Sequence, residues 1–533
     1  MKFSFPLFLI FMAALSGLTA CSSGGGSASC SLGTGASISV TGQITFDRVP
    51  LDSASGALDF ANTSTEPAQG VTVQAVCNSA ISSATTDANG HYSLSVPAGT
   101  NGVLVRAKAE MLKTGTPAWD VTVLDETQTG DVVFVMDGSP FNVVNSPLVR
   151  NLHAASGFDG LNYTTSRVAG PFAMLDTIRK AQNLVLSVNA SSIFPPLKVK
   201  WSEVSTTGTF YTNNTISVLG SLADTDEYDE HVIAHEWGHY FQDAFSRDDS
   251  IGGQHSQGNV LDIRVAFSEG FGNAFSAMVM GDSVYKDSQS VLFRTGFTID
   301  VESNSCPNEG WYNECSVQSV LFDFFDDDSE TSDVFNLGFT EIYDVMVNDM
   351  PNSPALTSIF NFITPFKAKS SVVGTDVDTL LNAQLIDQIT DDFGSGVTSL
   401  DADVAGTDVV PAFKTGDLTT GFNVCSTGGN GGYNGLGVNR FITFTSPATD
   451  RFTFNAVRTS GITQSDPDIY IYQNGIPLGG GESTVANSET FNVNLVTGVE
   501  YVLQVLEFTY SNPDYNPDAV GAINETCFTI SRT

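Results

Sequence analysis

Hydrophobic and polar residues alternate along the first part of the chain in short runs that turn residues separate. Such runs are Ile38 to Phe46, Val71 to Val76, His91 to Val96 and Val103 to Ala109. Alternation with a period of two is typical of strands that bury one face. We therefore expect residues 38–140 to form a small antiparallel β-sandwich.

The pattern becomes helical in the central part of the chain, residues 141–410. Pro171 suits the first turn of a helix. Phe172, Leu175 and Ile178 recur at helical spacing. These positions predict a helix from Gly170 to Ser187, and the central part as a whole reads as a mixed α+β domain.

The strand pattern returns in residues 415–533, which predict a second antiparallel β-sandwich. Its expected strands are Phe441 to Phe444, Arg451 to Asn455, Asp468 to Gln473, Glu489 to Val493 and Tyr501 to Leu506. A chain of 533 residues exceeds what one hydrophobic core usually organises. The fold class predicted is a multidomain protein in which an α+β domain is flanked by two antiparallel β-sandwich domains.

The first 20 residues have the pattern of a secretory signal peptide. Lys2 is followed by an apolar run from Phe3 to Leu15, which is too short to span a bilayer. The segment Leu18 to Cys21 resembles the lipobox of bacterial lipoproteins, in which Cys21 would become the lipidated first residue. Residues 21–37 would then be a Gly/Ser tether. An ordinary signal peptide cut nearby is the alternative.

This resemblance implies export and a lipid anchor in the bacterial outer membrane or at the cell surface. A location on the periplasmic face is the alternative.

The net charge of the chain limits its possible partners. Lys and Arg number 22 against 59 Asp and Glu, a net charge of −37. Such a surface repels nucleic acid phosphates and anionic lipid headgroups, so we expect no nucleic acid partner. We expect the protein to be a monomer.

The cysteines point to disulfide bonds, because thiols of exported proteins usually pair. The chain has seven cysteines, and lipidation of Cys21 leaves six. Six cysteines allow fifteen connectivities, which the sequence cannot separate. Pairing within each expected domain favours Cys30 with Cys77, Cys306 with Cys315, and Cys425 with Cys527.

The segment His235-Glu236-Trp237-Gly238-His239 is an HExxH motif. On a helix, His235 and His239 lie on one face about 6 Å apart along the axis, so both can bind one zinc ion. Glu236 then projects beside the metal, where its carboxylate can act as the general base toward the attacking water. The motif predicts a catalytic zinc site.

Such a site needs a third protein ligand. Gln242 and Phe245 occupy the positions where the metzincin extension has Gly and His, which excludes that branch. The segment from Ala266 to Phe275 resembles the gluzincins, the thermolysin-like zinc metallopeptidases, whose third ligand is a glutamate on a later helix. The resemblance implies Glu269 as that ligand. The aspartates of an aspzincin-like arrangement remain competitors, namely Asp248, Asp249 and Asp262.

The gluzincin resemblance also suggests residues around the metal. It implies that Asn273, one turn after the third ligand, accepts a hydrogen bond from a ligating histidine, where the family tends to have Asp. His255 could stabilise the oxyanion, or it could be a surface loop residue. His231 reads as a partly exposed helical residue, and Tyr312 stays unassigned. The β-prone stretch Thr215 to Leu219 would be the edge strand along which peptide lies.

The flanking domains resemble modules of secreted proteins. Val71 to Val73 and the segment from Thr86 to Gly99 resemble the carboxypeptidase regulatory-like, transthyretin-like module. Asp466 to Tyr472 and Gly498 to Val505 resemble the bacterial pre-peptidase C-terminal domain. Calcium could bind at the acidic residues Asp466 and Asp468 or in the run Asp323 to Asp328, although a turn and a solvated helix end explain them as well.

Together these features predict a zinc-dependent endopeptidase that hydrolyses peptide bonds, with Glu236 as its base. Two alternatives from other classes stay open. One is a surface-anchored binding or adhesion lipoprotein that keeps the fold without turnover. The other is a zinc hydrolase of amide bonds outside proteins, such as those of the cell wall.

Overall fold

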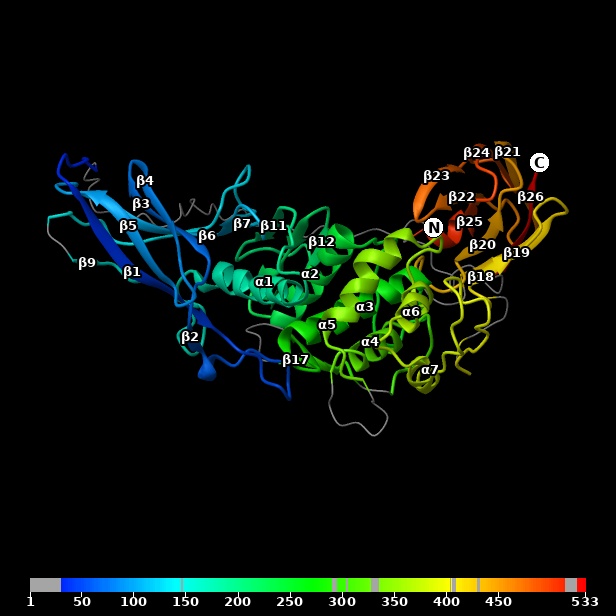
Figure 1. Ribbon diagram of the computed structural model, residues 1–533, viewed down its shortest axis with the longest axis horizontal. Helices are drawn as coiled ribbons and strands as arrows, with labels where there is room; N and C mark the ends of the chain where they lie inside the picture. Colours follow the sequence, from blue (N-terminus) through cyan, green and yellow to red (C-terminus); the bar gives the residue numbers. More distant parts are fainter. Residues whose placement is uncertain are drawn as a thin grey trace, which may run out of the picture.

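The computed structural model is an elongated, multidomain and β-rich molecule, with sheets at both ends and helices between them (Figure 1). It describes residues 30–144, 147–289, 295–302, 305–326, 335–402, 404, 409–428, 432–512 and 525–533. The expected signal peptide, Cys21 and the first part of the tether lie outside the described residues.

The long strand β1 (Ser37–Arg48) organises the first sheet. Its partners are β5 (His91–Pro97), β9 (Leu148–Val149), β2 (Ser64–Pro67) and β10 (Leu152–Ala154). Every second residue of β1 from Val40 to Phe46 is buried. The alternation in the sequence therefore corresponds to one face of this sheet turned to the core.

The second sheet joins the N-terminal region to the central region. Its order is β12, β13, β11, β7, β6, β3, β4, with β8 paired to β6. The strands are β3 (Val71–Cys77), β4 (Ser79–Thr85), β6 (Leu104–Lys113), β7 (Trp119–Asp125), β8 (Val135–Asp137), β11 (Leu197–Trp201), β12 (Phe210–Thr212) and β13 (Thr215–Ser217).

This second sheet does not end at residue 140, where the sequence placed a domain boundary. After the helix α1 (Ala169–Val188), the chain returns as β11 and pairs in parallel with β7. A crossover through a helix is what a parallel pair requires. One hydrophobic core consequently runs through both regions. The sheet also contains parallel pairs, whereas the sequence predicted an antiparallel arrangement.

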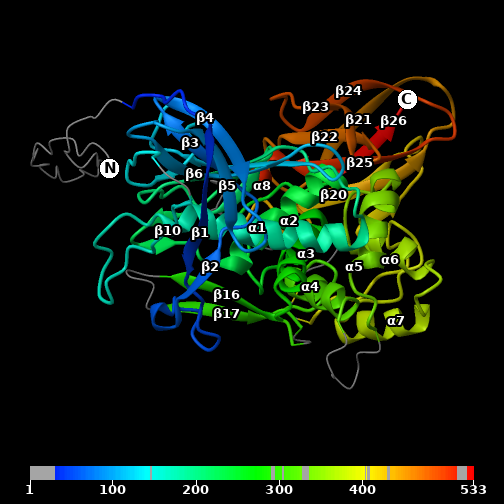
Figure 2. The same cartoon turned by 60° about the vertical axis from the view of Figure 1, so that its left-hand side comes forward.

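The helices form the middle of the molecule, and α3 packs against both α2 and α4 (Figure 2). Helix α1 begins and ends within one residue of its predicted bounds. The others are α2 (Glu230–Phe245), α3 (Ile263–Met280), α4 (Glu314–Asp323), α5 (Phe339–Asp344), α6 (Ile359–Lys367), α7 (Gly374–Ala383) and α8 (Phe508–Ser511). Short 3₁₀ turns span Phe60–Asn62 and Met350–Asn352, and a π turn spans Val345–Asp349.

Two small hairpins complete the central region. They are β14 (Gly220–Ser221) with β15 (Asp224–Thr225), and β16 (Val284–Gln289) with β17 (Thr295–Asp300). The first lies immediately before α2 in the chain and the second follows α3. Both hairpins contribute residues to a cavity that is described below.

The C-terminal region consists of two sheets with a core of their own, to which Ile442 and Leu503 contribute from one sheet and Phe454 and Phe528 from the other. One sheet has the order β18, β20, β25, β22, β23, and the other has β19, β26, β21, β24. The strands are β18 (Phe413–Thr415), β19 (Phe422–Thr427), β20 (Asn439–Thr445), β21 (Asp450–Ser460), β22 (Pro467–Gln473), β23 (Ile476–Gly481), β24 (Ser488–Leu495), β25 (Glu500–Glu507) and β26 (Glu525–Arg532). Among the described strands of this region, β18 and β20 pair in parallel and the other pairs are antiparallel.

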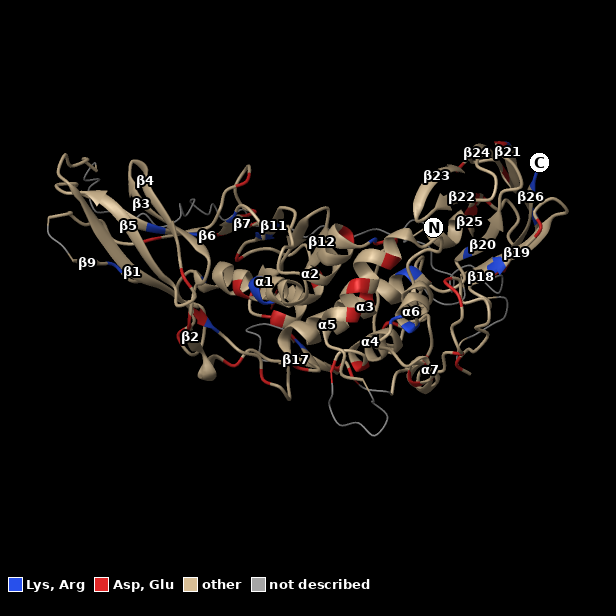
Figure 3. Cartoon of the chain, in the orientation of Figure 1, with Lys and Arg blue, Asp and Glu red and all other residues tan. Residues whose placement is uncertain are grey.

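Three disulfides are present, and they are the pairs expected from the sequence. They join Cys30 to Cys77, Cys306 to Cys315, and Cys425 to Cys527. Acidic residues are spread over all parts of the molecule (Figure 3). Across the part of the chain that the structure describes, no helix has the length and apolarity needed to cross a membrane.

Candidate metal centre

Helices α2 and α3 approach each other closely because glycines face each other at their crossing. A Cβ atom on Gly238 would lie 3.3 Å from the Cα of Gly272. A Cβ on Gly272 would lie 2.8 Å from Cε1 of the His235 ring. The absence of side chains at these two positions lets the ring of His235 lie directly over the backbone of α3.

Three potential ligand side chains converge at this crossing. The Nε2 atoms of His235 and His239 are 3.0 Å apart. Oε2 of Glu269 lies 3.2 Å from the first and 3.3 Å from the second. The two histidines come from successive turns of α2 and the glutamate from α3. The three predicted ligands thus form one group that could hold a metal ion.

The donor set fits a zinc ion. Nδ1 of His235 lies 2.9 Å from Oδ1 of Asn273 and donates to it, so the lone pair of its Nε2 faces the carboxylate of Glu269. Burial opposes protonation of His239, but the adjacent Glu269 outweighs burial and raises the pKa of His239 to about 9. The raised pKa means that a proton on His239 separates the nitrogen lone pairs of the two rings from the carboxylate of Glu269. Two imidazoles and one carboxylate are a common ligand set of catalytic zinc.

Glu236 lies beside the ligand group and is not part of it. Its side chain is 8% exposed, and it lines both cavities that adjoin the histidines. No hydrogen bond joins its carboxylate to another described residue. Glu236 is therefore a buried acceptor that opens on the space where a substrate would lie, as the general-base assignment requires.

Asn273 links the ligand His235 to a buried amide network. Its Oδ1 accepts the bond from His235, and its Nδ2 donates to Oε1 of Gln318 at 2.9 Å. Gln318, on α4, is fully buried. Asn273 occupies the place that the resemblance implied, and the second bond fixes which way its amide points. The amide oxygen holds the imidazole without adding a charge.

His255 lies at the site and not on a free surface loop. Its Nδ1 donates to Oε2 of Glu314 at 2.6 Å, and its Nε2 is 3.2 Å from Oε2 of Glu269. Gln257 donates to the other oxygen of Glu314 at 3.1 Å. The ring is 30% exposed and lines both cavities. Burial lowers the pKa of His255, but the adjacent Glu314 and Glu269 together raise it to about 9, so the ring is a charged donor at the cleft.

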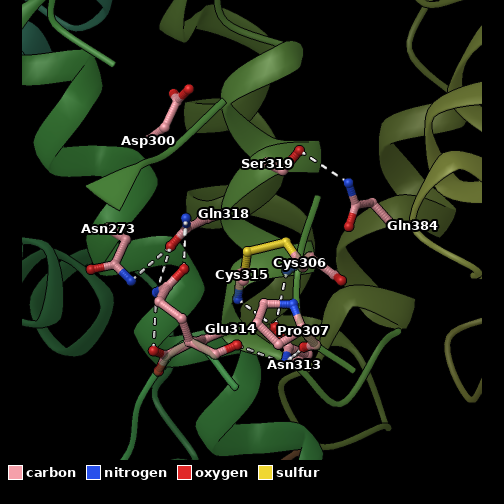
Figure 4. The surroundings of a disulfide bond; sticks show 12 residues. Asn273, Asp300, Cys306, Pro307, Asn313, Glu314, Cys315, Gln318, Ser319 and Gln384 are labelled. Carbon is pink, nitrogen blue, oxygen red and sulfur yellow. Dashed lines mark hydrogen bonds between the residues drawn. A yellow bond between two sulfur atoms is a disulfide. The ribbon is translucent and has the colours of Figure 1, made fainter. Parts of the chain in front are cut away.

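Glu314 stands at the start of α4, which two features hold in place (Figure 4). Oδ1 of Asn313 caps the helix by accepting from the backbone N–H of Cys315 at 2.8 Å. The disulfide from Cys315 to Cys306 ties the same turn to the preceding loop. The partner of His255 therefore rests on a rigid support.

The C-terminal domain also holds the loop that carries His255. Nδ2 of Asn434 donates to the carbonyl oxygens of Gly252 and Gln254, at 3.2 and 3.0 Å. Asn439 donates to Asp262 at the start of α3, at 2.9 Å. Contacts from a domain distant in sequence thus help to shape the site.

The competing aspartates have other partners. Asp262 caps α3 and pairs with Arg264 at 2.9 Å. Asp249 pairs with Arg247 at 3.0 Å. Asp248 accepts from the backbone of Ser250 at 2.9 Å. Within the described residues, none of the three belongs to a group that could hold a metal.

Two other residues noted in the sequence lie away from the ligand group. His231 is 4% exposed rather than partly exposed, because α2 packs it against α3, where its ring is 3.4 Å from Ser276. Burial lowers the pKa of His231 to about 4. The hydroxyl of Tyr312 donates to the carbonyl of Glu309 at 3.0 Å.

The suggested calcium residues Asp466 and Asp468 belong to no metal-binding group among the described residues. Part of the other suggested calcium segment, residues 323–328, lies outside the described residues.

Two cavities meet at His235 and Glu236, with volumes of about 480 and 510 Å³. The second is lined by the strand β12, which forms the edge of its sheet. The prediction that Thr215 to Leu219 is the edge strand was wrong, since β13 pairs with β11 on one side and β12 on the other. The available edge beside the metal ligands is β12.

Several residues of the first cavity were not among the predicted site residues. They are Asp224 and Asp226, which precede α2, and Tyr285 and Asp287, which come from β16. The acidic residues at alternate positions before the HExxH helix are a sequence signal that could have indicated Asp224 and Asp226. Nothing local indicated that a later strand would meet them.

Comparison with known proteins gives one family match. Residues 188–352 match the model of the mycolysin C-terminal domain, and this segment contains α2, α3 and α4. The match associates the chain with secreted metallopeptidases. No curated protein matches the chain.

Two solved structures are similar to short parts of the chain. The pre-peptidase C-terminal domain of collagenase from Bacillus anthracis is 14% identical, with a TM-score of 0.16, over 23% of this chain and 94% of that one. PliG from Aeromonas hydrophila, a periplasmic inhibitor of g-type lysozyme, is 12% identical, with a TM-score of 0.16, over 23% and 97%. Neither similarity contributes to the functional argument.

Proposed function

We propose that the protein is a zinc-dependent endopeptidase of the gluzincin type, with a zincin-like catalytic domain. The observation that carries the proposal is the convergence of His235, His239 and Glu269. Beside them lies the carboxylate of Glu236, which forms no hydrogen bond with another described residue. The match to the mycolysin C-terminal domain covers all four residues. Binding proteins that have no turnover have no need of such a base.

The roles of the side chains follow from their positions. When bound, zinc supplies a Lewis acid and makes water more acidic. Glu236 takes the proton of the attacking water and passes it to the departing amine. His255, oriented by Glu314, donates a hydrogen bond to the oxygen that gains charge. The edge of β12 can pair with the main chain of a peptide, which holds the substrate with little regard to its sequence.

The test is hydrolysis of a mixed library of quenched peptides by the chain without its first 21 residues. The Glu236→Gln and Glu269→Ala variants are measured beside it, with zinc content determined on all three. We expect cleavage by the parent alone, with a loss of about 10²- to 10⁴-fold for Glu236→Gln at unchanged zinc.

Glu269→Ala should lose zinc at concentrations that saturate the parent. Stoichiometric zinc in the parent without cleavage of any peptide would contradict the proposal and favour a binding lipoprotein or a hydrolase of cell-wall amides. Retention of zinc by Glu269→Ala at ordinary affinity would show that the ligand assignment is wrong.

We further propose that the exported chain is anchored by a lipid on Cys21 in the outer membrane. The three disulfides support an oxidising compartment, and so does the association with secreted metallopeptidases. Labelling with an alkyne fatty acid should mark the parent in the membrane fraction. The Cys21→Ala variant should be unlabelled, and an equally labelled variant would refute the anchor.

A further inference from the structure

The cavity of about 480 Å³ beside Glu236 has an acidic floor. Carboxylate oxygens of Asp224, Asp226 and Asp287 all lie within 4.8 Å of one another. Among the described residues that line the cavity there is no Lys or Arg. Three carboxylates thus share one space, and neither a Lys nor an Arg among the described lining residues compensates their charge.

The charge of this group is unfavourable in the empty cavity. Asp226 is 4% exposed; one of its oxygens accepts from the hydroxyl of Thr209, and the other has no hydrogen-bond partner among the residues that the structure describes. Burial, and after it the adjacent Asp287 and Asp224, raises the pKa of Asp226 well above its usual value. Burial and then Asp224 raise the pKa of Asp287 to about 7. A bound cation would relieve this repulsion.

A second feature of the cavity points to a ligand. Tyr285 is 8% exposed and lines the cavity, yet its hydroxyl has no hydrogen-bond partner among the described residues. Burial, and after it the charges of Asp287 and Glu236, raises the pKa of Tyr285 well above its usual value. This hydroxyl is therefore available to bond a group that enters the cavity.

Part of the wall of the cavity is apolar. Val232, Phe297 and Ile299 line it together with the carboxylates. A bare metal ion would not use such walls, whereas the methylene chain of a lysine or arginine would pack on them with its charged end in the acid group. The same cavity includes His235 and Glu236, so a side chain bound there would belong to a residue next to the reacting bond.

We propose that this cavity is a specificity subsite that binds the side chain of a lysine or arginine flanking the scissile bond of the substrate. The inference rests on the proposed peptidase function and adds to it a substrate class: peptides with a basic residue at the cleavage site. Asp224, Asp226 and Asp287 are its specificity-determining residues.

The experiment uses the zinc-loaded chain and matched quenched peptides that differ at one position on either side of the cleavage site. Lysine, arginine, norleucine, glutamine and glutamate are compared by kcat/KM, and cleavage sites are mapped by mass spectrometry. We expect lysine and arginine to exceed norleucine about 10- to 100-fold at one of the two positions, as for hydrogen bonds to charged groups.

Two variants make the result specific. Asp287→Asn should reduce the ratio of basic to norleucine peptides, and Asp287→Lys should favour glutamate. Asp282→Asn is the matched control: it removes an acid that lies two residues before the same hairpin and pairs with Lys286 outside the cavity, and it should keep the ratio. Equal rates for basic and norleucine peptides would overturn the proposal.

Binding to zinc-loaded Glu236→Gln, measured by fluorescence anisotropy, separates the two proposals. Preferential binding of basic peptides without any cleavage by the parent would refute the peptidase function and support the subsite.

Titration with Ca²⁺ tests whether the three carboxylates form a metal site instead. Micromolar Ca²⁺ binding that Asp287→Asn abolishes, with no preference for basic peptides, would identify a metal site and overturn the subsite.

Discussion

Substitution of Asn273 by alanine tests whether the amide network controls the metal centre. The change removes the acceptor that lies 2.9 Å from Nδ1 of His235 and the donor that lies 2.9 Å from Gln318. Loss of the first bond frees the ring of His235 to turn and leaves a buried N–H without a partner. Loss of the second leaves Oε1 of Gln318, on α4, with only the longer bond from Nε2 of Gln257, at 3.2 Å.

The two losses have different consequences. Removing the partner of a ligating histidine typically weakens metal binding about 10- to 100-fold. Because Asn273 is a neutral acceptor, we expect the lower end, about 10-fold, or about 1.4 kcal/mol of zinc binding free energy. The unsatisfied N–H of His235 should also lower the free energy of unfolding of the metal-free chain by about 1–3 kcal/mol.

Zinc affinity is measured by competition with a chromophoric chelator, and stability by denaturant unfolding of the metal-free protein. Ser276→Ala is the matched control, since its buried hydroxyl donates at 2.8 Å to the carbonyl of Asn273 on the same helix without contacting a ligand. Both variants should lose stability, but only Asn273→Ala should lose zinc affinity. Zinc affinities of the two variants within twofold of each other would refute the reasoning.

Three further predictions concern neighbouring residues. Gly272→Ala should displace the ring of His235, since the added Cβ would lie 2.9 Å from its Nδ1; zinc affinity by chelator competition should fall, and an unchanged value would contradict this. Glu314→Gln should keep stoichiometric zinc but lower kcat about 10-fold or more through the weaker hold on His255, as steady-state kinetics would show. The raised pKa of Asp287, about 7, means that its contribution to stability is present below about pH 4 and is lost as the pH rises to 7. Asp287→Asn should therefore be more stable than the parent above pH 7, by up to about 4 kcal/mol, and no more stable at pH 4; a pH-independent difference in unfolding free energy would argue against it.

The local features of this protein could be predicted from its sequence. Helix α1 has its predicted bounds within one residue, because apolar side chains three and four residues apart must share a helix face. The buried alternation in β1 follows from the pleat of a strand in the same way. The positions of His235 and His239 one turn apart are likewise a property of one helix, so the HExxH motif was informative without a fold.

Long-range packing decided the rest. Glu269 rather than an aspartate lies against the histidines because Gly238 and Gly272 let α3 approach α2. The edge strand is β12 and not the predicted stretch, since strand pairing depends on partners far away in the chain. The acidic cavity joins Asp226 to a strand that follows α3. Periodicity is set by the geometry of single elements, whereas convergence of side chains is set by how those elements pack, and only the tertiary structure contains that information.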